Sequence, residues 1–287
     1  MLAYLAISIA YFTTHECSKS PMDTKTEFWR DPAMPYIESR RACHSRACYK
    51  PHSHPSFSIG AVDLGTSNFF GAACGPMLIH AGTLVFVPST CVHSCNPLPG
   101  SAWSYQMLHL DAHWLDALKR ESCAGIQEDV VLASDTATYL KFCLLNSLLF
   151  SAASVDEKET ALIEFIGDYE SSRQGMLAVA MTPAVASIRL KAAMDCLQHE
   201  RLGMHSLAEL ARMVGMSRYQ LIRAFRTATG MTPHAYQLNF CINQARDWLR
   251  QGVALADIAY RLGFADQSHF QRVFKAHTGV TPGLYKA

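Results

Sequence analysis

Three histidines have a spacing that could bind a metal ion or a polar ligand. His52 and His54 alternate along an extended segment, which puts both side chains on one face, and His93 follows on a later expected strand. Three imidazoles can hold iron, manganese or zinc and leave coordination positions open for another molecule. The alternative without a metal is that these histidines line or rim a pocket, or form hydrogen bonds at the ends of strands.

A second set of informative residues consists of cations near the carboxyl end of the chain. Arg218, Arg223 and Arg226 fall within one short stretch, and Arg272 and Lys275 repeat the last two at an offset of 49 residues. Cations gathered on helices that can enter a DNA groove are typical of a surface that binds phosphates and bases.

These cations lie in a unit that occurs twice: LAELARMVGMSRYQLIRAFRTATGMTPHAY starts at residue 207 and LADIAYRLGFADQSHFQRVFKAHTGVTPGLY at residue 255. In each copy apolar residues recur at helical spacing, a glycine follows, and a second helical pattern ends at another glycine. We predict helix, tight turn, helix, with Ser217 and Asp266 as the N-caps of the two second helices. That geometry is typical of a DNA-reading helix-turn-helix, and a pair of helical hairpins without nucleic acid is the alternative.

The distribution of charge favours the DNA-binding interpretation. Residues 184–287 hold 13 Lys and Arg against 6 Asp and Glu, whereas residues 1–183 hold 12 against 18. The formal net charge of +1 therefore conceals a basic carboxyl-terminal part and an acidic amino-terminal part.

Residues 184–287, and above all GFADQSHFQRVFKAHTGVTPGLYK, resemble the DNA-binding domain of the AraC/XylS-type (arabinose-operon-regulator) transcription regulators. The resemblance implies two helix-turn-helix motifs, at about 207–228 and 255–277, joined by a long helix from Pro233 to Arg250. A leading helix from Pro183 to His199, capped by Thr182, would precede them. Double-stranded DNA is the implied partner, with two helices in adjacent major grooves about one helical turn, roughly 34 Å, apart.

The resemblance also places Tyr219, Ile222 and Arg223 in one groove, and it places Ala265, Ser268, His269 and Arg272 in the other. With their neighbours, the candidate DNA-contacting residues are Ser217, Arg218, Tyr219, Gln220, Ile222, Arg223, Arg226, Ala265, Asp266, Gln267, Ser268, His269, Arg272 and Lys275. Arginine can bind guanine bidentately, but Arg223 and Arg272 could instead contact a phosphate or hold the fold.

The first half of the chain carries strand signals in SFSIGAV, TLVFVP and WSYQMLHL, which Gly, Pro, Ser and Asn separate. These segments resemble the cupin-like sensor barrel of the same regulators. The expected fold class is therefore α+β: an amino-terminal β-barrel, a helical connector and an all-α domain with two helix-turn-helix motifs. A small-molecule effector is the implied ligand, with His52, His54, His93, Trp103 and Tyr105 as candidate binding residues and Met107 as a core residue.

The resemblance weakens the metal hypothesis, because residues 55–61 hold no carboxylate where metal-binding cupins usually place a glutamate. We therefore expect no catalytic residue, no bound metal and no cofactor. A metal-dependent cupin enzyme fused to a helical domain is kept as the alternative function, and a helical interaction scaffold as a third.

The expected domains are a doubtful leader at 1–21, a cupin-like domain at 22–115, a helical connector at 116–182 and a DNA-binding domain at 183–287. The apolar stretch MLAYLAISIAYF is 12 residues long, too short to span a bilayer, and Met22 is a candidate start. The connector is expected to be helical, with 136–170 as a candidate dimerisation region and 171–182 as the linker.

Ten cysteines are present without a Cys-x-x-Cys pair. We expect buried thiols that act as small hydrophobes, with a thiolate zinc site or redox sensing by the Cys43/Cys48 and Cys91/Cys95 pairs as weaker hypotheses. The function we predict is a cytoplasmic, effector-responsive transcription regulator with no membrane anchor, and RNA polymerase and a second copy of the chain are candidate partners.

Overall fold

The computed structural model describes residues 25–71, 76–121, 129–172, 177–179, 188–199, 202 and 205–286. The expected leader and the Thr182 cap lie outside these residues. The chain divides into two compact units: Met1–Ala47, Pro55–Cys91 and Cys95–Met181 form the first, and Cys48–His54, Val92–Ser94 and Thr182–Ala287 form the second. Each is described by itself.

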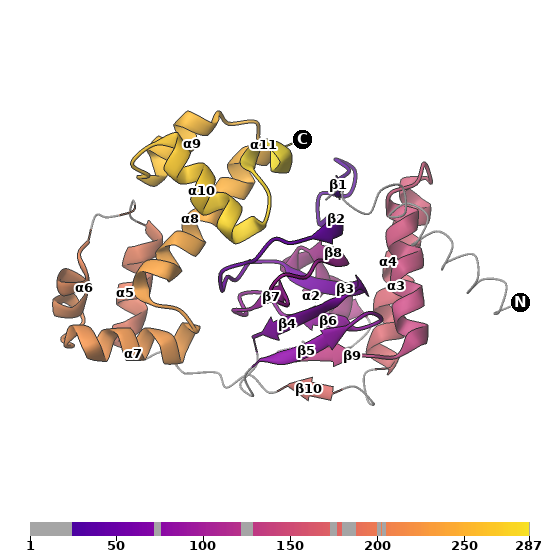
Figure 1. Ribbon diagram of the computed structural model, residues 1–287, viewed down its shortest axis with the longest axis horizontal. Coiled ribbons are helices and arrows are strands. Elements are labelled where there is room, and N and C mark those ends of the chain that lie inside the picture. Colours follow the sequence, from indigo (N-terminus) through magenta and orange to yellow (C-terminus); the bar gives the residue numbers. More distant parts are fainter. Residues whose placement is uncertain are drawn as a thin grey trace, which may run out of the picture. The chain divides into compact units, whose positions relative to one another are not determined.

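The described strands of the first unit form two antiparallel sheets (Figure 1). The seven-stranded sheet has the order β1 (Lys25–Trp29), β2 (Ile37–Ser45), β8 (Trp103–Leu110), β3 (Phe57–Leu64), β6 (Leu84–Val87), β9 (Val130–Ala133), β10 (Leu177–Val179). The three-stranded sheet has the order β5 (Met77–His80), β4 (Thr66–Phe70), β7 (Ser94–Pro97). The strands expected in SFSIGAV, TLVFVP and WSYQMLHL are confirmed as β3, β6 and β8.

Alternation along the strands gives the large sheet two apolar faces. One face, with Ile59, Phe86 and Leu108, packs on Phe142 and Phe165 of the helices. The other face lies toward the small sheet. The buried apolar cluster between the two sheets consists of Ala42, Val62, Phe69, Ile79, Val85, Val87, Cys91, Trp103, Tyr105 and Val130. The unit is thus a helix layer, a large sheet and a small sheet.

Three helices follow β8, with β9 between the first two and β10 after the third: α2 (Ala112–Glu121), α3 (Thr136–Leu149) and α4 (Val155–Ser172). Figure 1 shows α3 and α4 side by side along one flank of this unit. Asp135 caps α3, and Ser154 caps α4 in a reciprocal pair with Glu157. The expectation of an entirely helical connector was wrong, because β9 and β10 extend the large sheet within it. VVLA and LAV are too short to show a strand pattern without their pairing partner.

A buried polar network links the large sheet to α3. Asp63 accepts hydrogen bonds at the same oxygen from Gln106 Nε2 and Tyr139 Oη, each 2.8 Å long. Asn146 continues the network by donating to Gln106 and accepting from Ser39. Burial raises the pKa of Asp63 to about 6, although both hydrogen bonds act in the opposite direction.

The second unit is helical: α5 (Ile188–His199), α6 (Leu207–Met213), α7 (Arg218–Thr229), α8 (Pro233–Arg250), α9 (Leu255–Leu262), α10 (Gln267–Thr278) and α11 (Pro282–Lys286). The long helix expected from Pro233 to Arg250 is confirmed, with Thr232 as its N-cap. Leu210 and Ala211 of α6 pack on Leu221 and Phe225 of α7. Among the described residues, no helix is long and apolar enough to cross a bilayer.

Candidate functional site

The α7 helix is fixed at both ends by local sequence. The side chain of Ser217 accepts a hydrogen bond from the backbone N–H of Gln220, whose own side chain accepts from the backbone of Ser217, and this reciprocal pair starts the helix. Gly230 ends it with φ +71°, a left-handed conformation that favours glycine. Leu221 and Phe225 are fully buried, so the opposite face is available to a ligand.

The α10 helix repeats this construction in the second motif. Asp266 accepts from the backbone N–H of His269 at 2.6 Å, and Gly279 ends the helix with φ +78°. Phe270 and Phe274 are fully buried, and each such side chain stabilises the unit by roughly 1.5–3 kcal/mol. Both N-caps expected from the sequence are confirmed.

The candidate DNA-contacting residues lie on α7 and α10 or in the turns just before them. Ile222 and His269 are half-buried, and the ring of His269 meets the edge of Phe264 with centroids 5.4 Å apart. The other candidates are exposed: Ser217, Arg218, Tyr219, Gln220, Arg223, Arg226, Ala265, Asp266, Gln267, Ser268, Arg272 and Lys275. Tyr219 is 68% exposed, with the Arg223 guanidinium 5.8 Å from its ring centre. A large aromatic ring held in solvent beside a cation is suited to a partner surface.

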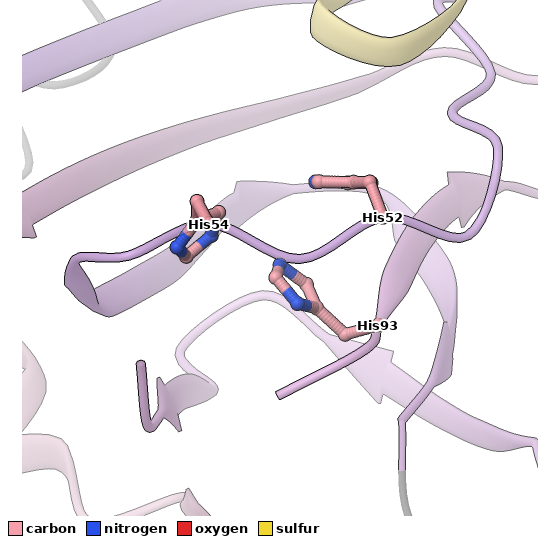
Figure 2. A group of neighbouring side chains, drawn as sticks. All are labelled: His52, His54 and His93. Carbon is pink, nitrogen blue, oxygen red and sulfur yellow. The ribbon is translucent and has the colours of Figure 1, made fainter. Parts of the chain in front are cut away.

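The three histidines form a second cluster, shown in Figure 2. His52 and His54 lie on residues 48–54, here called the strap, and His93 reaches toward them from residues 92–94. One ring nitrogen of each histidine lies within 4.8 Å of the others, and the His52 and His93 ring centroids are 4.6 Å apart. The expectation that they sit on barrel strands was wrong, because His52 and His93 pair only as an isolated bridge.

The environment of the cluster favours a neutral imidazole at His52. His54 and His93 are buried. Burial, reinforced by His93 and His54, holds the pKa of His52 well below its usual value, and the charge of Arg246 acts in the same direction. His52 Nδ1 lies 2.8 Å from the carbonyl oxygen of Lys50, so Nδ1–H donates and Nε2 is the basic nitrogen.

The strap is bonded to the helices of the second unit. The backbone N–H of Ser53 donates to Asn239 Oδ1 at 3.1 Å, and Asn243 Nδ2 donates to the carbonyl of Ser53 at 2.8 Å. The N–H of Lys50 donates to the carbonyl of Ala276 in α10 at 3.2 Å. Sequence reasoning missed Asn239 and Asn243, although two amides one turn apart on an otherwise amphipathic helix are a weak signal for such a contact.

Trp103 and Tyr105 belong to the first unit and lie in the buried layer between its two sheets. Their rings stack at 4.4 Å, and each residue is 3% exposed. Among the described residues, neither Trp103 Nε1 nor the buried Ser67 Oγ has a hydrogen-bond partner. Of the five candidate effector-binding residues, Trp103 and Tyr105 belong to the first unit and the three histidines to the second.

The cysteines differ from the expected buried thiols at two positions, Cys43 and Cys48. Cys43 is disulfide-bonded, whereas Cys48 is an exposed thiol outside any disulfide, so these two do not pair. Cys91 and Cys95 are not disulfide-bonded, and burial raises the pKa of Cys91 to about 11 and that of Cys95 to about 12. Such thiols are weak nucleophiles at neutral pH, which argues against redox sensing by this pair.

Comparison with known proteins agrees with both halves of this architecture. The family model for the AraC-like ligand binding domain matches residues 34–149, and a helix-turn-helix domain model matches residues 210–287. The uncharacterized HTH-type transcriptional regulator YbfI of Bacillus subtilis is 25% identical over 83% of this chain and 87% of its own. The chain belongs to the AraC-type transcription regulators. It is a DNA-binding regulator with an amino-terminal ligand-binding domain.

A further relative of this AraC-type regulator is similar over a shorter stretch, and a solved structure shares the fold over most of the chain. The transcriptional activator NphR of Rhodococcus is 31% identical over 41% of this chain and 38% of its own. The crystal structure of ToxT from Vibrio cholerae O395 has the same fold, with a TM-score of 0.54 at 15% identity, and the match covers 92% of this chain and 96% of that one. The α+β fold class predicted from the sequence is confirmed, but the strands among the described residues form two open sheets and not the closed barrel that we expected.

Proposed function

We propose that this regulator reads its operator by inserting α7 and α10 into two successive major grooves. One observation carries the proposal: in both copies of the motif the apolar face is buried, while the cations on the other face are exposed. Each helix starts at a capped turn and presents its amino-terminal residues to solvent, as the recognition helix of a helix-turn-helix does.

Within this surface, Arg223 and Arg272 are the proposed base-reading residues. They occupy equivalent positions in the two motifs, one turn or more from the cap, and both are exposed. A guanidinium there can bind guanine O6 and N7 as a pair of hydrogen bonds. Arg218, Arg226 and Lys275 are the proposed phosphate contacts, which hold the helices in register without reading sequence.

The effector is proposed to bind in the layer between the two sheets of the first unit. Trp103 Nε1 and Ser67 Oγ support this, since buried donors are usually satisfied and a ligand oxygen can accept from them. In this proposal Tyr105 stacks below Trp103 as part of the pocket wall. The His52, His54 and His93 cluster belongs to the second unit and is not part of this proposed pocket.

We propose further that the protein acts in the cytoplasm, without catalysis, on promoters bound by RNA polymerase. The domain limits of 22–115, 116–182 and 183–287 remain our proposal. Leu144 of α3 and Ile163 of α4 are large apolar side chains exposed by 43% and 40%, which supports a homodimer through these two helices.

The test is repeated selection from randomised duplex DNA with the full-length protein. We expect two short selected blocks, spaced by about one helical turn. Arg223→Ala and Arg272→Ala should each cost about 1–3 kcal/mol in operator affinity and relax selection within one block only. Arg250→Ala is the matched control, because Arg250 lies on the last turn of α8, bonded to Asp247, and should leave both blocks unchanged.

Salt dependence separates base contacts from phosphate contacts. Arg226→Ala should weaken binding to all sequences about equally and lower the log–log salt slope by about 1, whereas Arg223→Ala should change sequence preference. Complete lack of DNA binding at low salt, with the helical unit folded, would refute the proposed function.

A further inference from the structure

We propose that His52, His54 and His93 form a binding site for one divalent transition-metal ion of the zinc class, and that the bound ion fixes the strap against α8 and α10. The inference goes beyond the proposed function. It rests on the geometry of the cluster and on the contacts of the strap.

The ligand set is chemically suited to this class of metal. The group consists of three imidazoles, whereas calcium and magnesium require oxygen ligands. Tetrahedral zinc with Zn–N bonds of 2.0–2.1 Å needs nitrogens about 3.3 Å apart. The nitrogens of the cluster lie within 4.8 Å of one another, so rotation of the imidazoles and a small shift of the strap bring them to bonding distance. A fourth position then stays open for water or an effector atom.

The surroundings of the histidines orient them for binding. The hydrogen bond from His52 Nδ1 to the carbonyl of Lys50 fixes the tautomer and leaves Nε2 for the ion, as outer hydrogen bonds of metal-ligating histidines do. The paired backbone bonds between His52 and His93, at 3.0 and 2.9 Å, hold the two segments in register.

Binding at this place has a structural consequence, because the two segments that supply the ligands are far apart in the chain. An ion bonded to His52, His54 and His93 cross-links residues 48–54 to residues 92–94. The strap is also bonded to Asn239 and Asn243 of α8 and to Ala276 of α10. Metal occupancy therefore orders the segment that touches the second recognition helix.

The first experiment is titration of chelator-treated full-length protein with Zn²⁺ alone, followed by calorimetry and by metal analysis of the dialysed complex. We expect one Zn²⁺ per chain. His54→Ala and His93→Ala should each weaken binding at least about 10-fold, because each removes a ligand. His234→Ala is the control: this histidine is exposed on α8 outside the cluster and its loss should change nothing.

A rescue variant guards against trivial unfolding. His93→Cys offers a thiolate, which zinc also accepts, so it should retain binding that His93→Ala loses. Absence of saturable 1:1 binding, or binding equally strong in His54→Ala and His93→Ala, overturns the site.

The second experiment measures hydrogen exchange of the strap in the full-length protein. Zn²⁺ should slow exchange of the N–H groups of Lys50, His52 and Ser53 in the natural sequence and not in His93→Ala. Equal exchange rates with and without bound Zn²⁺ would overturn the ordering of the strap. Neither experiment uses DNA, so failure here is distinguishable from failure of the proposed function.

Discussion

Substitution of Gly279 by alanine tests directly whether the strap packs on the end of α10. Gly279 has φ +78°, and a Cβ built there would lie 2.7 Å from Tyr49 Cε1. Gly252 has a similar φ of +85°, but a Cβ there would meet nothing within 4 Å. Both substitutions carry the left-handed penalty of about 1–2 kcal/mol, and only Gly279→Ala adds overpacking of about 1–3 kcal/mol.

Seven of the described helices lie in the second unit and three in the first, so far-ultraviolet circular dichroism during urea unfolding of the full-length protein reports chiefly on the second unit. Gly252→Ala should lower the free energy of unfolding by about 1–2 kcal/mol, and Gly279→Ala by about 2–4 kcal/mol. In a Tyr49→Ala background the additional loss at Gly279 should disappear, because the side chain that the new Cβ meets is gone. The cycle should therefore give a coupling of at least about 1 kcal/mol.

Equal losses for Gly279→Ala and Gly252→Ala, or a Gly279→Ala loss that Tyr49→Ala leaves unchanged, would refute the packing of the strap on α10. The ordering of the strap by metal would then lose its structural basis. The metal site itself would still be tested by the zinc titration.

Three further predictions concern other parts of the chain. Ser217→Ala removes the N-cap of α7 and should destabilise the second unit by about 1 kcal/mol in the same urea assay; a change below about 0.3 kcal/mol would show that the cap is dispensable. The pKa of Asp63 is about 6 in the folded protein and 3.8 in the unfolded chain, so the folded state favours the protonated carboxyl. This contribution to the free energy of unfolding is fully present below about pH 4 and is lost as the pH rises from about 4 to 6. Asp63→Asn keeps the accepting oxygen, so it should remove this pH dependence and stabilise the protein at pH 7 by up to about 3 kcal/mol, and an unchanged profile would contradict the assignment. A thiol reagent at neutral pH should modify the exposed Cys48 well before Cys95, whose pKa burial raises to about 12, as peptide mass analysis of the folded protein can show.

The sequence alone determined the DNA-binding half in considerable detail. Ser217 and Asp266 were predicted as caps from the residue pattern, the resemblance implied the long helix Pro233–Arg250, and all three are confirmed. These features depend on hydrogen bonds and apolar contacts within a few residues, so a single stretch of sequence contains all the information they need. Because the motif occurs twice, the same pattern of apolar residues, cap and glycine supports each assignment in both copies.

The tertiary structure decided the features that depend on distant pairing. The strands β9 and β10 exist because a sheet edge accepts them, not because VVLA or LAV prefers that conformation alone. The meeting of His93 with His52 and His54, the bonds from the strap to α8, and the burial that raises the pKa of Asp63 all join segments separated by tens of residues or more. The type of a residue determines which chemistry its side chain can perform. The partners of that side chain depend on strand order and packing, which a local sequence pattern does not determine.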